Sequence, residues 1–271
     1  MSDLEAGYTR RGPLGVITLR RPEALNALTS GMIAEIHRLA LAAERDPAVV
    51  ALCITGEGRG FCAGIDMSLL TEHTRSGPPP ASDAGEDQRT RPALFSFLLD
   101  ISKPVIAAVN GVGAGGGFVL AMMCDLRFLA EDASLITIFS RRGLIAEHGT
   151  SWLLPRMIGL NRALDLLWSS RRLDAAEAYR LGLADRVVPA EKLLDEVEAY
   201  VTAIASSVSP RALAVIKAQV HRHLETTFDI AAAESAALMA EALVHRDAAE
   251  GAASFVERRV PKFAPWAGGN S

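Results

Sequence analysis

The sequence PVIAAVNGVGAGGGFVLAMMCD, residues 104–125, carries no charge before its last residue. It holds five glycines, all between positions 111 and 117. An uncharged segment from Pro104 to Cys124 is long enough to cross a bilayer, but Asn110 and the glycines occupy its middle. Each glycine inside a helix costs about 1 kcal/mol relative to alanine. We therefore expect a buried strand, a glycine-rich turn and a short helix, and no membrane span.

The flanking sequence predicts an α/β fold. Residues 14–20 and 49–56 alternate apolar and β-branched positions, as strands do, and residues 125–132 predict another strand. The segment between the first two strands predicts a helix with an apolar stripe and with Thr29 or Ser30 as its cap. The stripe consists of Ile33, Ile36, Leu39 and Ala40. Strands that alternate with helices favour a mainly parallel sheet.

The character of the chain changes near residue 190, after which the patterns are helical without strands. We divide the chain into a core, residues 1–195, and a helical C-terminal region, residues 196–271. Residues 72–92 are rich in Pro, Ser, Gly and charge, so they predict a mobile surface loop.

Composition limits the partners. The 271 residues are 49% hydrophobic and 22% charged, which is typical of a globular protein, and the net charge of −4 gives no reason to expect nucleic acid or an anionic membrane as a partner. Cys53, Cys62 and Cys124 have no metal-ligand spacing, and the N-terminus lacks a secretory pattern. Both observations favour the cytoplasm and buried thiols.

The glycine turn is open to three interpretations. Gly111, Gly113 and Gly116 spell G-x-G-x-x-G after a strand, with Glu131 ending the next strand, which is the pattern of an NAD-dependent oxidoreductase. A second small-residue turn, GEGRGFCAGIDM at 56–67, also follows a strand, and two such turns can aim two backbone N–H groups at one carbonyl oxygen. Otherwise, both segments are simply tight turns.

Four motifs in order resemble the crotonase, or enoyl-CoA hydratase/isomerase, superfamily. They are FCAGIDM, NGVGAGGGFVLAMMCD, LPRMIG at 154–159 and RRVPKF near the end, and they cover nearly the whole chain. The resemblance implies a spiral of ββα units with a C-terminal helical oligomerisation region, assembled as a homotrimer or a dimer of trimers. It also implies a coenzyme A thioester as substrate, with no metal or redox cofactor.

Residue by residue, the resemblance places the oxyanion donors on the backbone N–H groups of Ile65 and Gly116. These donors hold the thioester enolate that the family's reactions share. The neighbouring turn residues are expected to bind substrate; they are Ala63, Gly64, Asp66 and Gly115. For Asp66 we expect mainly a structural task, ordering the turn or capping the following helix.

The positions of the two hydratase glutamates are Val119 and Phe139 in this chain. Neither side chain can move a proton, so water addition by the usual mechanism is doubtful. Glu147 aligns with the single carboxylate of one branch of the enoyl-CoA isomerases. A double-bond shift needs only one base, which removes a proton from C2 and delivers it to C4. We expect Val119 and Phe139 to form an apolar pocket that raises the pKa of this base.

Other residues are weaker candidates. Trp152 is expected to shape the acyl pocket, and Lys262 in RRVPKF to contact the adenosine phosphate. His148 is expected to lie at the surface or to act as a proton shuttle. Arg141 and Arg142 are expected at a solvated strand end or paired with Glu147 or coenzyme A.

The remaining candidates lie at or beyond the end of the glycine-rich stretch. Asp125 is expected to be structural, and His221 and His223 to be exposed. The alternatives left open are a hydratase-like or hydrolase-like enzyme, an NAD-dependent oxidoreductase and a non-catalytic acyl-CoA-binding protein.

Overall fold

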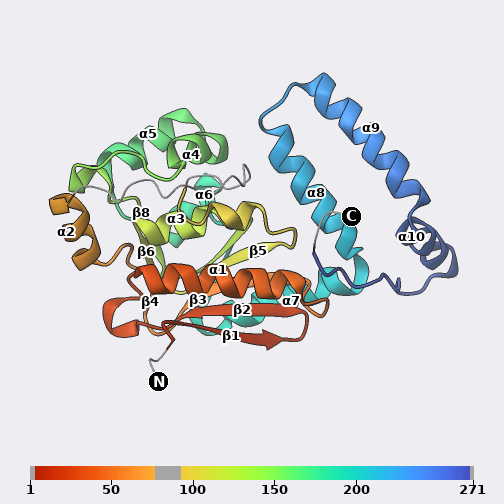
Figure 1. Ribbon diagram of the computed structural model, residues 1–271, viewed down its shortest axis with the longest axis horizontal. Coiled ribbons are helices and arrows are strands. Elements are labelled where there is room, and N and C mark those ends of the chain that lie inside the picture. Colours follow the sequence, from red (N-terminus) through yellow and green to blue (C-terminus); the bar gives the residue numbers. More distant parts are fainter. Residues whose placement is uncertain (1–3, 77–92, 269–271) are drawn as a thin grey trace.

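The computed structural model describes residues 4–76 and 93–268. Figure 1 shows a core of sheets and helices from which three C-terminal helices project to one side. These helices are α8 (Pro210–His223), α9 (Phe228–Val244) and α10 (Arg246–Glu257).

Six strands form the larger sheet, in the order β1-β2-β3-β5-β7-β10. Only β1 and β2 pair antiparallel, and every later pair is parallel. All residues of β3 and β5 are buried, as expected for central strands with both faces covered. The bounds are β1 (Ala6–Arg11), β2 (Leu14–Leu19), β3 (Ala51–Gly56), β5 (Val105–Val109), β7 (Leu126–Ala130) and β10 (Arg186–Val188).

Four short strands form a second sheet, in the order β4-β6-β8-β9. Here β4, β6 and β8 run parallel, and β9 is antiparallel to β8. The bounds are β4 (Gly60–Cys62), β6 (Val112–Ala114), β8 (Ser134–Ile136) and β9 (Leu173–Asp174).

Three consecutive ββα units connect the two sheets. Each unit gives its first strand to the larger sheet and its second to the smaller one, and a helix follows. The units are β3-β4-α2, β5-β6-α3 and β7-β8-α4, where α2 is Met67–Ser76, α3 is Gly116–Met122 and α4 is Thr150–Ile158. The expected spiral of ββα units is therefore confirmed, and it places the ends of β4 and β6 side by side.

Helix α1 (Ser30–Arg45) covers the larger sheet as predicted (Figure 1). The Thr29 hydroxyl accepts a hydrogen bond from the Met32 N–H at 3.0 Å, which confirms it as the cap. The buried stripe includes the predicted Ile36, Leu39 and Ala40, whereas Ile33 is only partly buried.

The remaining elements complete the core. They are α5 (Leu160–Ser169), α6 (Ala175–Leu181), α7 (Leu193–Ser207) and the 3-10 helices η1 (Pro22–Ala24), η2 (Ser96–Leu99), η3 (Ser140–Arg142) and η4 (Ala190–Lys192). The division placed between residues 195 and 196 falls inside α7. Because α7 buries Val197 and Val201 against the sheet, the observed change to exposed helices comes after Ser207.

Two sequence-based alternatives are wrong, because residues 104–125 fold as β5, β6 and α3. In a dinucleotide-binding unit, the strand before the glycine turn is followed directly by a helix. Here, β5 is followed by another strand, β6. A Cβ built on Gly111 would lie 2.1 Å from the Arg59 carbonyl oxygen, so this glycine allows close packing of two chain segments. The membrane alternative fails for the same stretch, since its apolar residues fill the core.

Within residues 4–76 and 93–268, no single helix has the length and apolarity to span a membrane, although the bent pair Ala190–Ser207 and Pro210–His223 would by length and composition. The predicted loop at 72–92 is wrong for residues 72–76, which belong to α2. The rest of that prediction, residues 77–92, lies outside the described residues.

Helix α8 is fixed to the core by ion pairs at Asp125. The Lys217 ammonium lies 2.6 Å from Oδ2 of Asp125, and His221 Nε2 lies 3.3 Å from Oδ1. Burial acts to raise the pKa of Asp125, but His221 and Lys217 hold that pKa below its usual value. The structural assignment of Asp125 is confirmed. The expectation that His221 and His223 are exposed is wrong, because both imidazoles are half-buried against carboxylates, His223 against Glu234.

Candidate active site

The two small-residue turns meet at the carboxyl ends of β4 and β6. A Cβ built on Gly64 would lie 2.7 Å from the Ala114 carbonyl oxygen and 3.2 Å from the Gly116 nitrogen. Gly64 has a φ of +100°, a conformation that L side chains rarely adopt, so glycine is required there on two grounds. The close contact between the turns that the sequence suggested is thus present.

The first turn is held by a parallel bridge between Leu28 and Ile65. The Leu28 N–H donates to the Gly64 carbonyl at 2.7 Å, and the Asp66 N–H donates to the Leu28 carbonyl at 3.0 Å. The N–H and C=O of one trans peptide group point in opposite directions. Since the Gly64 carbonyl points to Leu28, the Ile65 N–H of the same peptide group is directed away from Leu28. It is therefore available to a ligand.

The second expected donor, the Gly116 N–H, lies at the start of α3. Gly116 is the first residue of this helix, so its N–H has no acceptor inside the helix. Gly115 precedes it with a φ of +52° and a ψ of −116°, and as a glycine it has no side chain that could cap the helix. A Cβ on Gly117 would lie 2.1 Å from the Cys62 carbonyl oxygen, which explains why α3 opens with small residues. The positive end of the helix dipole adds to the attraction for negative charge at this point.

Asp66 orders the first turn, as expected. Its Oδ1 accepts hydrogen bonds from the Ser68 N–H at 3.1 Å and the Ser68 hydroxyl at 2.8 Å, at the start of α2. Its Oδ2 lies 3.0 Å from Nη1 of Arg21. The bonds from Ser68, and then the Arg21 guanidinium, hold the pKa of Asp66 below its usual value. Both carboxylate oxygens are engaged within the protein.

Val119 and Phe139 lie in the core, at 0% and 2% exposure. Val119 is inside α3, and Phe139 precedes η3. Their burial is consistent with an apolar surrounding. The expected pocket around Glu147 stays a prediction.

Glu147 lies in the turn before α4, as predicted. Its carbonyl accepts hydrogen bonds from the Thr150 N–H at 3.0 Å and the Thr150 hydroxyl at 2.7 Å, and Thr150 is fully buried at the first position of α4. The side chain is half-buried. Within the described residues, no lysine or arginine forms an ion pair with its carboxylate.

His148 is not the surface residue that we expected. It is half-buried, its φ is +51°, and its Nδ1 accepts a hydrogen bond from the Leu94 N–H at 3.2 Å. This bond leaves the proton of a neutral ring on Nε2. Burial lowers the pKa of His148, against the opposing effect of the Glu147 charge. The imidazole therefore fixes the 93–95 segment to the Glu147 turn.

Arg141 and Arg142 do not pair with Glu147. They lie in η3 rather than at a strand end, and both are exposed. Arg141 donates to the Ser169 carbonyl at 3.3 Å, and Nη1 of Arg142 lies 3.1 Å from the Met67 sulfur.

Two predicted binding residues make contacts within their own part of the chain. Trp152 is half-buried on α4, where its ring receives the Arg156 guanidinium at 3.9 Å. Lys262 is exposed beyond α10, and its N–H donates to Glu250 of that helix at 2.5 Å. In Figure 1, α10 and the ends of β4 and β6 lie on opposite sides of the molecule. The predicted contact of Lys262 with the adenosine phosphate stays a prediction.

Sequence reasoning missed two polar residues that hold the first turn in place. Asn26 is fully buried and donates to the carbonyls of Glu57 and Gly60 at 3.0 and 2.8 Å. Arg21 reaches Asp66, as described above. The available signal was RPEALNAL at 21–28, in which Asn26 stands among the small and apolar residues 24–28 and an arginine begins the segment.

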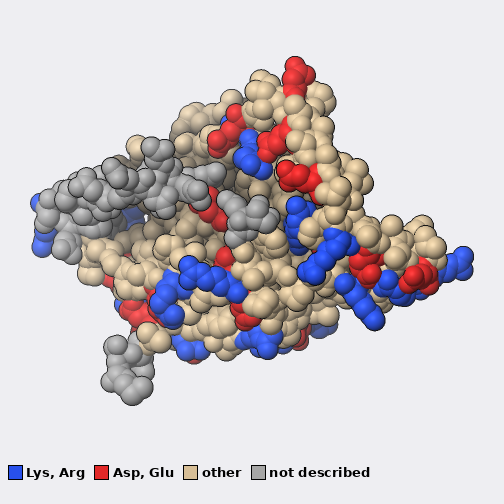
Figure 2. All heavy atoms as spheres, turned by 45° about the vertical axis from the view of Figure 1, so that its right-hand side comes forward, with Lys and Arg blue, Asp and Glu red and all other residues tan. Residues whose placement is uncertain are grey.

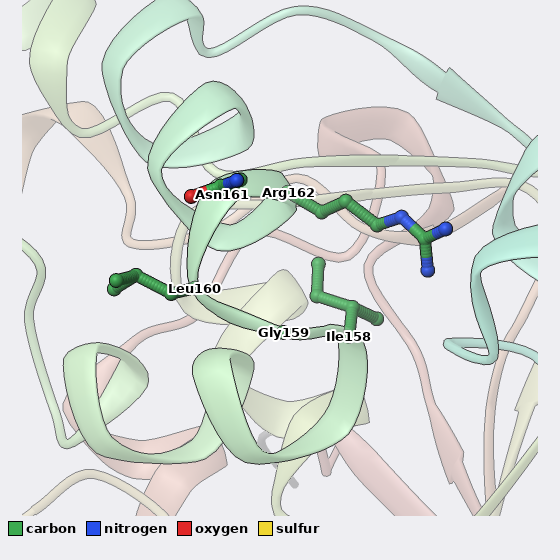
Figure 3. A pocket seen from close by; sticks show the side chains of 5 residues that line it. All are labelled: Ile158, Gly159, Leu160, Asn161 and Arg162. Atoms are coloured by element: carbon green, nitrogen blue, oxygen red, sulfur yellow. The ribbon is translucent and has the colours of Figure 1, made fainter.

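A hollow of about 290 Å³ lies at the junction of α4 and α5 (Figure 3). It is lined by residues 158–162, none of which was predicted to take part in the site. Across residues 4–76 and 93–268, no cluster of three or more His, Cys, Asp or Glu side chains is arranged to hold a metal ion. Figure 2 shows acidic and basic side chains interspersed over one face.

Comparison with known proteins gives consistent matches over nearly the whole chain. The family profile described as enoyl-CoA hydratase/isomerase matches residues 9–265. The probable enoyl-CoA hydratase echA8 of Mycobacterium leprae is 39% identical over 257 residues, covering 95% of this chain and 95% of that protein. The 1,2-epoxyphenylacetyl-CoA isomerase of Escherichia coli K12 is 35% identical, covering 97% and 99%. The crystal structure of an enoyl-CoA hydratase from Polaromonas sp. JS666 is 31% identical with a TM-score of 0.85, covering 95% and 99%.

Proposed function

The chain belongs to the enoyl-CoA hydratase/isomerase family, and from this premise we propose that it shifts the double bond of an enoyl-CoA thioester, with Glu147 as the base. Membership makes the protein an acyl-CoA-processing enzyme. The proposed reaction breaks a C–H bond at C2, moves the double bond from C3–C4 to C2–C3, and forms a C–H bond at C4. The intermediate is an enolate whose negative charge rests on the thioester oxygen.

Stabilisation of that oxygen is assigned to the Ile65 and Gly116 N–H groups. Three features support this assignment: the contact between the two turns, the orientation of the Ile65 N–H, and the position of the Gly116 N–H at the start of a helix. Two fixed donors aimed at a developing oxyanion lower the barrier by several kcal/mol, because removing one donor from such a pair costs about 3 kcal/mol. The thioester carbonyl would therefore lie between Ile65 and Gly116.

The observation that carries the isomerase proposal is the pair Val119 and Phe139, two buried apolar residues where the hydratases of the resembled family have glutamates. Hydration needs one group to activate water and another to protonate the α-carbon. Isomerisation needs one carboxylate, and Glu147 is half-buried with no ion-pair partner in the described part of the chain. A single base at this position is sufficient for the shift.

Hydration is the second candidate, because the names of the similar proteins favour it. Most of the relatives are named enoyl-CoA hydratases, and one is named an epoxyphenylacetyl-CoA isomerase. A hydratase reaction in this chain would need a second acid or base other than Val119 and Phe139.

We also propose that the enzyme works without a metal or redox cofactor, in the cytoplasm, as a trimer or dimer of trimers. Assembly is supported by the C-terminal helices, whose large apolar side chains are exposed in the single chain. The most exposed are Phe228 at 84%, Val244 at 87% and Phe255 at 85%.

The test compares two reactions in the wild type, Glu147→Gln and Glu131→Gln. Formation of the conjugated 2-enoyl-CoA from a 3-enoyl-CoA raises the ultraviolet absorbance, and hydration of a 2-enoyl-CoA lowers it. We expect isomerisation by the wild type, an activity lower by about 10²- to 10⁴-fold in Glu147→Gln, and full activity in Glu131→Gln, which changes an exposed glutamate at the end of β7. Faster hydration than isomerisation, or an active Glu147→Gln, would refute the proposal.

A further inference from the structure

One arginine joins the segment before α1 to the first oxyanion turn. Nη1 of Arg21 donates to the Ala27 carbonyl at 2.7 Å and to Oδ2 of Asp66 at 3.0 Å, and Nε lies 3.3 Å from Oε1 of Glu5. The side chains of Arg21 and Asp66 are only 21% and 23% exposed. The contact is therefore partly buried, unlike a pair of fully exposed surface charges.

The contact spans both sides of the bridge that orients Ile65. Ala27 precedes Leu28 on one side of the bridge, and Asp66 follows Ile65 on the other. The guanidinium bonds to both, so it limits the relative movement of the two segments. Ser68 holds the other oxygen of Asp66 through its N–H and its hydroxyl. The chain is therefore fixed at Asp66, the residue that directly follows Ile65. The Gly64–Ile65 peptide group, which carries the Ile65 N–H, is held on its other side by the bond from the Leu28 N–H to the Gly64 carbonyl.

Arg21 is itself held by the turn between β3 and β4. Its N–H donates to Oδ1 of Asn26 at 2.9 Å. The buried Asn26 amide in turn donates to the carbonyls of Glu57 and Gly60. The arginine therefore has a fixed backbone from which its side chain reaches the oxyanion turn.

We propose that Arg21 is a positioning residue that holds the Ile65 N–H at hydrogen-bond distance from the thioester oxygen, acting through Asp66. The proposal rests on the assignment of Ile65 as an oxyanion donor. Such a donor is effective at about 2.7–3.1 Å from the oxyanion, and a displacement of about 1 Å reduces the rate by up to 10²-fold. A guanidinium is suited to the task because its planar, rigid set of donors meets several acceptors at once, which a lysine ammonium does not.

The experiment uses the full-length protein and a ligand that needs no turnover. Cinnamoyl-CoA is a conjugated thioester, and its absorbance moves to longer wavelength when its carbonyl accepts hydrogen bonds. We expect the bound wild type to give this shift, and Arg21→Met to reduce it by about half or more, while the Kd changes less than about threefold. With a 3-enoyl-CoA, kcat falls about 10- to 100-fold and KM changes little.

Arg171→Met is the matched control. Arg171 also bonds to two carboxylates, those of Asp165 and Glu177, but at the junction of α5 and α6 away from the turns. It should lower the melting temperature by a similar amount and leave the absorbance shift and kcat unchanged. If Arg21→Met does not fold, Arg21→Lys supplies the comparison. That variant keeps the charge and is expected to restore the melting temperature while recovering only part of the shift.

A second change tests whether the effect passes through the carboxylate. Asp66→Asn retains an oxygen for Ser68 and loses the ion pair with Arg21, so it should reproduce the loss of shift. The double variant Arg21→Met/Asp66→Asn should be no worse than either single variant, because the residues act as one unit. Additive losses would contradict the proposed path.

The outcomes separate this inference from the proposed function. A full absorbance shift in Arg21→Met overturns the positioning role. A wild type that shifts cinnamoyl-CoA but does not isomerise a 3-enoyl-CoA refutes the isomerase and leaves the positioning role supported. A wild type that binds cinnamoyl-CoA with no shift overturns both.

Discussion

Replacing Gly64 with alanine tests the contact between the two turns. The new Cβ would lie 2.7 Å from the Ala114 carbonyl oxygen and 3.2 Å from the Gly116 nitrogen. Carbon atoms do not come so close to backbone oxygen, and backbone has no flexible end that can swing aside. One turn must therefore move away from the other by a few tenths of an ångström.

Two effects set the magnitude. The φ of +100° at Gly64 adds about 1–3 kcal/mol of backbone strain for any L side chain. Separation of the turns also moves the Gly116 N–H relative to the Ile65 N–H. Loss of one well-placed donor reduces kcat by about 10²- to 10³-fold, so we expect a reduction of at least about 10²-fold, together with a melting temperature lower by a few degrees.

Gly182→Ala is the control for strain alone. Gly182 has a φ of +84°, and the nearest atom to its Cβ position is the Met157 carbonyl oxygen at 3.9 Å, which is an ordinary contact. Both variants should lose a similar amount of stability, measured by thermal unfolding, but only Gly64→Ala should lose kcat. If the two variants have equal kcat values, the turns do not form the catalytic contact that we describe.

Three further predictions concern other parts of the chain. Lys217→Met leaves the carboxylate of Asp125 without its closest ion partner, so urea unfolding at pH 7 should show a free energy of unfolding lower by about 3–5 kcal/mol, and a decrease of less than about 1 kcal/mol would contradict this prediction. Because the pKa of Asp125 is lowered on folding, the stability that its charge contributes is present at neutral pH and is lost below about pH 4. His148→Asn keeps an acceptor for the Leu94 N–H and tolerates the positive φ, so this variant should fold normally. Because the pKa of His148 is lowered on folding, the wild type should lose stability as the pH falls below about 6.5, and the variant should lose less stability over the same pH range. Phe255→Glu places a charge on an 85% exposed apolar position, and light scattering should show a smaller assembly than the wild type, whereas an unchanged mass would exclude this position from the subunit contact.

The sequence predicted the elements that have a strong period or a long buried run. The strands at 14–20 and 49–56, the buried strand expected at the start of residues 104–125 and the helix after Thr29 are all found in the structure. Their alternation or apolar stripe spans enough residues to be recognised. The second sheet was missed because β4, β6 and β8 are three residues long, too short for any period. For the same reason, the three ββα units leave no visible repeat in the sequence.

The site was predictable where it depends on chain order and glycine, and not where it depends on distant pairs. The turns of Ile65 and Gly116 follow strands of one parallel sheet, so their meeting follows from topology. By contrast, Arg21 meets Asp66 across 45 positions, and His148 meets Leu94 across 54. No local pattern encodes such contacts. His221 was misjudged for this reason: its charged neighbours along the helix suggested exposure, while its partner Asp125 lies on the core.

If Glu147 alone moves a proton from C2 to C4 of a thioester held by the two turns, the proton it delivers is the one it removed. Nuclear magnetic resonance can follow this transfer with a 3-enoyl-CoA deuterated at C2, in water. We expect a 2-enoyl-CoA that carries part of the deuterium at C4, and no such transfer in Glu147→Gln. A 3-hydroxyacyl-CoA as the main product, or transfer that persists in Glu147→Gln, would contradict this expectation.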